Sequence, residues 1–322
     1  MIENIPEAED LEKVALRLYF NAWTELVRLC GISDVAVYEA FGYSDASPEA
    51  KKELEEEKQH LLQWSQPDLQ VIYTMIQQSL EIGLKAILCR ISPFALLLGS
   101  DIRTWPSKPK DFTSYRSIDA ADLPKAIASL SDTPLSEEFV QSFHEFRKNR
   151  NQIAHIGVFQ TELEPHNLLK SLITQFGELY PNKNWIKERL KLAEEQISPY
   201  LTHKRYTETT MLWEELEVVL PIIENKHYKT LFNISKAAKR HVCDHCVQEA
   251  YAHDAGIDPV NVRTAVYQPD TKSLNCIVCG STVEYMLRDC SHADCNGKFT
   301  GKDYWEEEMC LLCGRNNESP IG

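Results

Sequence analysis

Apolar residues recur at intervals of three and four along most of the chain before residue 224, the period of amphipathic helices packed on a core. This period predicts helices over residues 8–30, 48–62, 71–90, 136–157, 165–180, 184–197 and 207–224. Gly31 is expected to end the first helix and Pro67 to open the third. From His241 onward the helical period is lost and closely spaced cysteines replace it. We therefore expect a mainly α fold followed by a small region with short β-strands.

The helix expected over residues 136–157 has clear end signals and one unusual position. Ser136 is a favourable N-cap, and Gly157 is suited to the position just past the last turn. The stripe expected to face the core consists of Phe139, Phe143, Phe146, Arg150 and Ile153. An isolated charge is costly to bury, so the arginine must pair, extend to solvent or line a cavity.

Arg150 and His155 are five positions apart, so in a straight helix their side chains point about 140° away from each other. Asn151 and His155 are four apart and lie on one face. Arg150 and His155 would converge if the helix end is distorted, or if two copies of the chain pack across a two-fold axis.

The run Arg150-Asn151-x-x-Ala154-His155-x-Gly157 resembles the Arg-x4–6-His signature of the HEPN superfamily. HEPN domains also commonly carry a helix of the type Glu-x-x-x-Lys-Ala before the signature helix, and Glu81, Lys85 and Ala86 match it. Arg240 and His245 have the spacing of the signature too, but they lie inside the cysteine region. The resemblance covers residues 66–160 and implies an all-helical, dimeric, metal-independent ribonuclease.

This resemblance implies roles for individual side chains in RNA cleavage. A 2′-hydroxyl would attack the adjacent phosphate, giving a 2′,3′-cyclic phosphate and a 5′-hydroxyl. His155 would act as base or acid, Arg150 would hold the phosphate, and Asn151 would orient the imidazole or bind a phosphate oxygen. Glu81 could pair with Arg150 or tune His155. The local basic residues expected to meet the substrate are Arg147, Lys148 and Lys85.

Eight of the ten cysteines lie between Cys243 and Cys313 in four close pairs, a spacing that favours metal binding over disulfides. The expected zinc ligands are Cys243, Cys246, Cys276, Cys279, Cys290, Cys295, Cys310 and Cys313. Either sequential or nested pairing would form two four-cysteine sites, and His241, His245 or His292 could each replace a thiolate. With every position filled by protein, two zinc ions per chain would be structural.

The length of 322 residues allows two or three domains. We expect N-terminal helices over residues 1–65, a HEPN-like core over 66–160, accessory helices over 161–240 and a zinc-ribbon region over 241–322. The chain begins with an acidic segment and contains no apolar run of about 18 residues, which predicts a cytoplasmic protein without a membrane partner.

The net charge of −14 opposes broad, non-specific binding to nucleic acid. Two zinc sites of four thiolates each would make it −18, because each site carries two net negative charges. RNA would then have to meet a local basic patch. Acidic residues between Asp270 and Glu308 favour protein contact or a structural cap for the zinc region, and disfavour an RNA-binding role for it.

The leading hypothesis is an endoribonuclease that acts as a homodimer on RNA, of the kind found among bacterial toxins and anti-phage defence effectors, with an inhibitory or activating protein partner. The alternative is a non-catalytic HEPN and zinc-ribbon adaptor or sensor that binds a protein or nucleotide signal. The long segment over residues 99–123 carries Arg103, Trp105, Tyr115 and Arg116, which could contact substrate or simply pack on the helices.

Overall fold

The computed structural model describes residues 2–41, 48–97, 110–156, 162–196, 207–252, 262–303 and 305–317. The chain divides into two compact units, Met1–Pro181 and Asn182–Gly322. The described helices and the small antiparallel sheets confirm the expected mainly α fold with a β-containing C-terminal region. None of the described helices is long and apolar enough to cross a bilayer.

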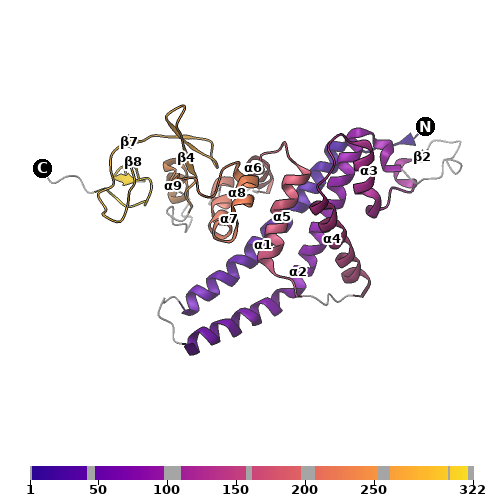
Figure 1. Ribbon diagram of the computed structural model, residues 1–322, viewed down its shortest axis with the longest axis horizontal. Helices are drawn as coiled ribbons and strands as arrows, with labels where there is room; N and C mark the ends of the chain where they lie inside the picture. The colour runs from indigo at the N-terminus through magenta and orange to yellow at the C-terminus, as the bar shows by residue number, and fades with distance from the viewer. Residues whose placement is uncertain are drawn as a thin grey trace. The chain divides into compact units, whose positions relative to one another are not determined.

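The first unit is built on two long helices, α1 (Ala8–Phe41) and α2 (Pro48–Ile91), which pack along each other (Figure 1). Helix α5 (Pro165–Leu179) contacts both, and α3 (Leu123–Leu130) and α4 (Glu137–Ile156) pack on α2. Large apolar side chains from these helices fill the core: Tyr19, Phe20, Trp23, Leu26, Ile76, Leu84, Phe143 and Phe176. Short 3-10 helices connect α2 to α3, and β1 (Ile2–Glu3) pairs in parallel with β2 (Lys110–Asp111).

Two predicted helix ends in the first unit are wrong. Helix α1 continues through Gly31, because a glycine inside a helix costs only about 1 kcal/mol and the residues just before it are fully packed. Helix α2 is continuous through Pro67, where two separate helices were expected. The apolar face continues across the proline through Leu69, and the Ser65 Oγ and Gln66 Nε2 donate to the Leu62 carbonyl just before it. Burial of that face against α1 outweighs the hydrogen bond that the proline cannot make.

The second unit combines helices with two small sheets. Helices α6 (Trp185–Gln196), α7 (Glu208–Ile222) and α8 (Asn225–Phe232) pack together, and α9 (Asp244–Ala252) contacts α7. The first sheet is antiparallel in the order β3 (Arg240–His241), β4 (Ala265–Gln268), β5 (Ser273–Cys276) and β6 (Thr282–Val283). The second contains β7 (Met286–Leu287), β8 (Phe299–Lys302) and β9 (Glu308–Cys310), also antiparallel.

The two sheets belong to one packed module. The ring of Phe299 on β8 lies 5.0 Å from that of Tyr267 on β4 and 5.0 Å from that of His241 on β3, measured between centroids. The amide of Val242 donates to the carbonyl of Leu311 at 2.7 Å. The region therefore does not consist of two independent ribbons joined by a linker.

Two elements of the second unit were not expected from the apolar pattern. Helix α9 lies in the region where the sequence has lost its helical period, and α8 follows α7 after a short break. Helix α5, expected among the accessory helices over residues 161–240, lies in the first unit and packs on α1.

Candidate functional sites

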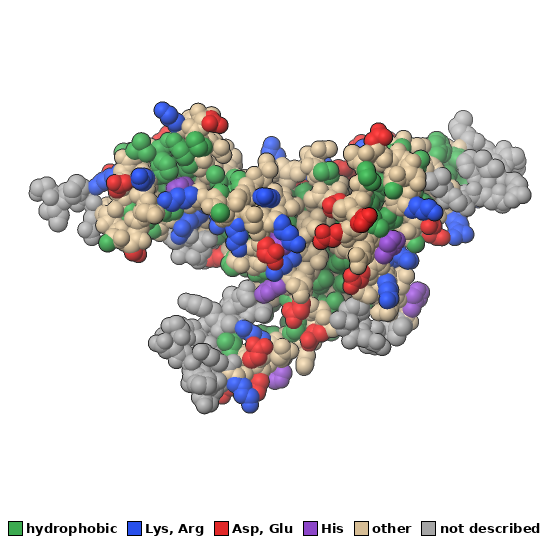
Figure 2. All heavy atoms as spheres, in the orientation of Figure 1, with side chains coloured by type: hydrophobic (Ala, Val, Ile, Leu, Met, Phe, Trp, Pro, Cys, Tyr) green, Lys and Arg blue, Asp and Glu red, His purple; other side chains and the backbone are tan. Residues whose placement is uncertain are grey.

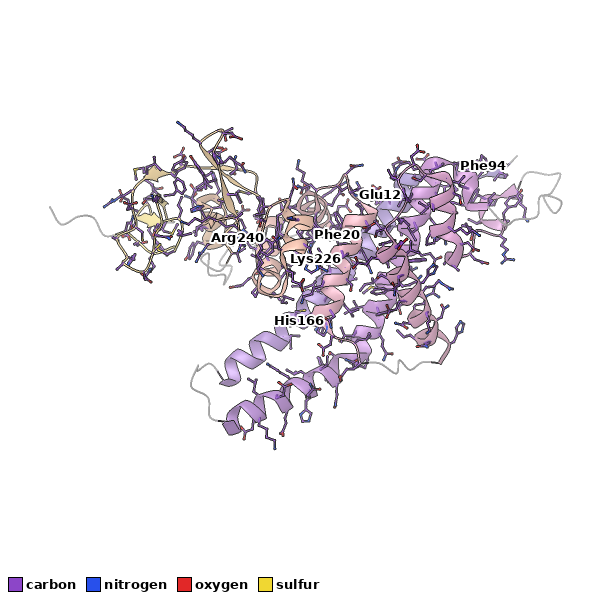
Figure 3. All side chains as sticks on the ribbon, in the orientation of Figure 1. Glu12, Phe20, Phe94, His166, Lys226 and Arg240 are labelled. Carbon is purple, nitrogen blue, oxygen red and sulfur yellow. The ribbon has the colours of Figure 1, made fainter. Side chains whose placement is uncertain are left out.

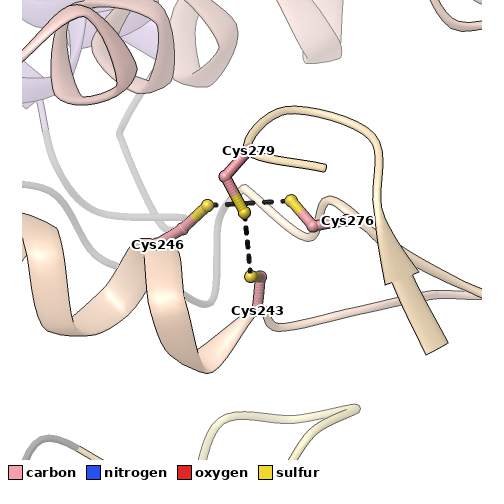
Figure 4. A group of neighbouring side chains, drawn as sticks. All are labelled: Cys243, Cys246, Cys276 and Cys279. Carbon is pink, nitrogen blue, oxygen red and sulfur yellow. Dashed lines mark hydrogen bonds between the residues drawn. The ribbon is translucent and has the colours of Figure 1, made fainter. Parts of the chain in front are cut away.

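The first cysteine group joins a helix start to a hairpin turn. Cys243 immediately precedes α9 and Cys246 lies in its first turn, whereas Cys276 ends β5 and Cys279 follows it in a tight turn. The Sγ atoms of Cys243 and Cys279 are 3.7 Å apart, and so are those of Cys246 and Cys276 (Figure 4). All four sulfurs lie within 4.8 Å of one another, and three of the four residues are buried.

The second group has the same form. The Sγ atoms of Cys290 and Cys313 are 3.8 Å apart, as are those of Cys295 and Cys310. All four again lie within 4.8 Å of one another. A tetrahedron with four Zn–S bonds of about 2.3 Å has edges of roughly 3.8 Å. Both groups therefore have the spacing that a zinc ion requires, and they fit two zinc ions per chain.

The pairing of the cysteines is sequential. Cys243/Cys246 meet Cys276/Cys279, and Cys290/Cys295 meet Cys310/Cys313, so the nested alternative is wrong. Neither group includes a histidine among the described residues. His241 packs edge-on against Phe299, and the His292 Nε2 lies 3.0 Å from the carbonyl of Asn316. Four thiolates at each centre leave no open coordination position, as expected of structural zinc.

Backbone amides and one hydroxyl surround the sulfurs. The amides of Val278, His292 and Gly297 donate to the Sγ atoms of Cys276, Cys290 and Cys295 at 3.4 to 3.5 Å. The Thr264 hydroxyl lies 3.2 Å from the Cys276 Sγ. These donors stabilise thiolates, which are the form that binds metal.

The two glycines that follow cysteine pairs adopt the conformation that their position requires. Gly280 and Gly314 have φ angles of +75° and +73°, and their amides donate to the carbonyls of Cys276 and Cys310. A side chain is unfavourable at such angles, so glycine is suited to these tight turns.

Gly297 is required for a different reason, and its replacement by alanine is expected to remove the second zinc ion. A Cβ at this position would lie 2.5 Å from the Cys310 Sγ and 3.0 Å from the Cβ of Leu312. The sulfur cannot yield without leaving the tetrahedron, so bound zinc should fall from two equivalents towards one, as measured by elemental analysis after gel filtration. Gly280→Ala is the control. Its Cβ would meet nothing within 4 Å, so only backbone strain of about 1–2 kcal/mol is expected and both zinc ions should be kept.

A polar ladder connects α2 and α4 in the first unit. Tyr73, Gln77 and Glu81 are spaced by four residues on α2 and so lie on one face. The ring of Tyr73 stacks on that of Phe146 at 4.5 Å, and its hydroxyl accepts a hydrogen bond from the Asn149 Nδ2 at 3.0 Å. Burial raises the pKa of Tyr73 to about 12, so this hydroxyl stays protonated.

Arg150 continues the ladder and pairs across the two helices. Its Nε donates to the Gln77 Oε1 at 2.8 Å, and one Nη lies 3.5 Å from the Glu81 Oε2. Glu81 also accepts a hydrogen bond from Lys85 at 2.7 Å. Burial acts to raise the pKa of Glu81, but hydrogen bonds from Lys85 and Gln77 and the charges of Lys85 and Arg150 together hold it below its usual value. Of the three environments open to Arg150, pairing is the one found, while its side chain stays 30% exposed.

The remaining predicted catalytic and substrate-binding residues are distributed around α4. His155 is exposed in the last turn of α4, and Asn151 is half-buried one turn before it. Lys148 is exposed on α4, and Arg147 has a buried Nε with no hydrogen-bond partner among the described residues. Within one chain, Arg150 points to α2 and His155 to solvent, so the helix end does not bring them together.

The structure describes only part of the segment over residues 99–123. Tyr115 is half-buried with the Lys110 Nζ 5.1 Å from its ring centroid, and Arg116 pairs with Asp119 at 2.9 Å. Arg103 and Trp105, also named as candidates, lie outside the described residues.

No protein-family model, no curated protein and no solved structure matches this chain. The HEPN signature therefore remains a resemblance carried by a few residues. The chain is thus characterised by two four-cysteine groups that fit zinc and by a polar cluster between α2 and α4 that contains Arg150 and Glu81.

Proposed function

We propose that this chain is a metal-independent endoribonuclease of the HEPN type that acts as a homodimer. The observation that carries the proposal is the placement of Arg150 between Gln77 and Glu81. The arginine of the α4 signature and the acidic residue of the α2 motif belong to one polar cluster, and pairing with Arg150 is one of the two roles considered for Glu81. A buried, purely structural arginine would instead be closed off from solvent.

The geometry of Arg150 suits a phosphate clamp. A guanidinium has five N–H donors, and the contacts of Arg150 with Gln77 and Glu81 use its Nε and one Nη. With 30% of the side chain exposed, donors remain for the oxygens of a phosphodiester. Its partners on α2 hold the guanidinium in a defined position, which reduces the entropy lost on binding.

His155 would supply proton transfer. It is exposed at the end of α4 and faces away from Arg150 of its own chain. A second copy, related by a two-fold axis, would place one chain's imidazole near the other chain's guanidinium and would provide two histidines, one as base and one as acid. Asn151, one turn before His155, would orient the ring or bind a phosphate oxygen.

The proposal predicts that His155→Ala and Arg150→Ala abolish RNA cleavage. Removing a general acid or base costs about 100-fold to 10,000-fold in rate. Total RNA would be incubated with each protein in magnesium-free buffer containing EDTA, with zinc content checked afterwards. Cleaved ends would be analysed for a 2′,3′-cyclic phosphate and a 5′-hydroxyl. His60→Ala, an exposed histidine on α2, is the matched control and should cleave like the wild type.

Two results would contradict the proposed nuclease activity. One is cleavage by His155→Ala at the wild-type rate. The other is the absence of cleavage by a folded wild-type dimer, which would favour the adaptor or sensor. A role as toxin or anti-phage effector, and a protein partner that restrains or triggers it, belong to the same proposal.

A further inference from the structure

The second unit contains a basic stretch that stands out in an acidic chain. Between Asn225 and Cys243 there is no aspartate or glutamate. Five basic residues lie in this stretch, and together they are called the basic surface: Lys226, Lys229, Lys236, Lys239 and Arg240. The four lysines are exposed and the arginine is half-exposed.

The fold brings these residues together around α8. The Asn225 Oδ1 accepts hydrogen bonds from the hydroxyl of Ser235 at 3.1 Å and the amide of Lys236 at 2.8 Å, so the chain after α8 folds back to its start. The Lys236 Nζ and the Arg240 guanidinium lie 5.5 and 4.9 Å from the centroid of the Tyr228 ring. Figure 3 labels Lys226 and Arg240, and Figure 2 shows Lys and Arg side chains close together over the part of the second unit that carries α8.

The residues of the basic surface have no carboxylate partners among the described residues. Several other basic side chains of this unit do pair with acidic ones: Lys183 with Glu188, Arg189 with Glu215, Arg288 with Glu308, Lys302 with Glu306 and Arg315 with Asp294. None of the five residues of the basic surface forms an ion pair with any described residue. Their charge is therefore available to an external anion.

The surface continues towards the second zinc centre. The Lys239 Nζ donates to the Asn296 Oδ1 at 3.2 Å, and Asn296 lines an open hollow of about 390 Å³. Arg263 and Arg315 also line the hollow, as does Asp294, which pairs with Arg315 at 2.6 Å. Phosphate groups bound along α8 could thus extend into a hollow that offers further donors.

We propose that the basic surface binds the phosphate backbone of RNA. The apolar residues of α8, Leu231 and Phe232, are buried, so the surface offers nothing to insert into a lipid bilayer. Several unpaired cations with an adjacent hollow suit a flexible chain of phosphates, whose counterions are released on binding. This surface goes beyond the proposed function, because binding does not require the chemistry assigned to His155. The acidity of the rest of the chain would then disfavour non-specific binding of RNA elsewhere.

The test is the binding of a labelled single-stranded RNA of about 25 nucleotides, long enough to contact the whole basic surface. Fluorescence anisotropy would be measured with the full chain carrying His155→Ala, so that cleavage cannot interfere. Lys226→Glu/Lys229→Glu would be compared with Lys187→Glu/Lys191→Glu, which changes two exposed lysines of α6 and alters the charge equally. The ammonium groups of these four lysines form no hydrogen bond or ion pair with described residues, and zinc content and circular dichroism would confirm folding.

The α8 variant, Lys226→Glu/Lys229→Glu, should bind RNA at least about tenfold more weakly than its parent. The slope of the logarithm of the binding constant against the logarithm of salt concentration should be less steep by about 1.4, since each lost contact to a single strand removes about 0.7. The α6 variant should bind like its parent. Equal weakening by both pairs would overturn the proposal, as would no binding by the parent at low salt, or binding only to anionic vesicles. If the wild type binds RNA but does not cleave it, the proposal for the basic surface is supported and the proposed nuclease activity is contradicted.

Discussion

Replacement of Cys246 by serine is expected to remove the first zinc ion and unfold the module around it. Cys246 is buried in the first turn of α9, with its sulfur 3.7 Å from that of Cys276. A serine hydroxyl does not replace a thiolate as a zinc ligand. Binding of a structural zinc is worth about 10–16 kcal/mol in apparent free energy, and that binding energy is also folding energy. The loss of one ligand should therefore destabilise the whole sheet that contains β3 to β6.

Elemental analysis should give two zinc equivalents for the wild type and about one for Cys246→Ser. Hydrogen exchange should show loss of protection over residues 240–283. Cys89→Ser is the control, because Cys89 is a buried cysteine of the first unit whose Sγ donates to the Pro6 carbonyl at 3.3 Å. A serine can keep that hydrogen bond, and both zinc ions should remain. Two equivalents of zinc in Cys246→Ser would show that this cysteine is not a ligand.

The second large effect is expected at Arg189 and Glu215, a buried ion pair between α6 and α7. Arg189 is fully buried, and its Nε and one Nη donate to the two carboxylate oxygens of Glu215 at 3.0 and 2.5 Å. Arg189→Met would leave a carboxylate buried without its partner. Such a change costs about 3–5 kcal/mol, because the remaining charge loses its compensation. This loss in the free energy of unfolding would be measured by urea unfolding of the full chain, monitored by hydrogen exchange in residues 185–232.

The double variant Arg189→Met/Glu215→Met tests whether the lost stability comes from the single buried charge that Arg189→Met leaves behind. Replacement of both charges by apolar side chains is often neutral or stabilising, so the double variant should recover most of the stability lost in the single variant. Lys183→Met is the matched control, since the pair that Lys183 forms with Glu188 is partly exposed and should be worth at most about 1 kcal/mol. If the single and double variants lose stability equally, the coupling across this pair is absent.

The environment of Arg150 depends only in part on the apolar pattern of α4. The apolar stripe of α4 predicted that the charge at residue 150 would have to pair, extend to solvent or line a cavity, and the structure shows pairing with a side chain that is 30% exposed. The pattern could not identify Gln77 as its closest hydrogen-bond partner. That contact depends on the rotation of α2 against α4, which is set by packing such as the stack of Tyr73 on Phe146.

The basic surface was missed for a similar reason. Its residues are scattered between Lys226 and Arg240, and the net charge of −14 for the whole chain gives no indication of a local cluster of basic residues. They become one surface only because the segment after α8 folds back to Asn225. Arg189 and Glu215 likewise give no local signal, because they are 26 positions apart and on different helices.

The sequence by itself determined the helical period, the start of α4 at its serine cap and the eight zinc-binding cysteines with their glycine turns. These features are local, since they depend on spacing within one turn or one knuckle. Only the tertiary structure decided that the cysteines pair sequentially, that α1 and α2 continue through Gly31 and Pro67, and that Arg150 pairs with α2. Each of these depends on contacts between segments distant in the chain, where burial and pairing outweigh local preference.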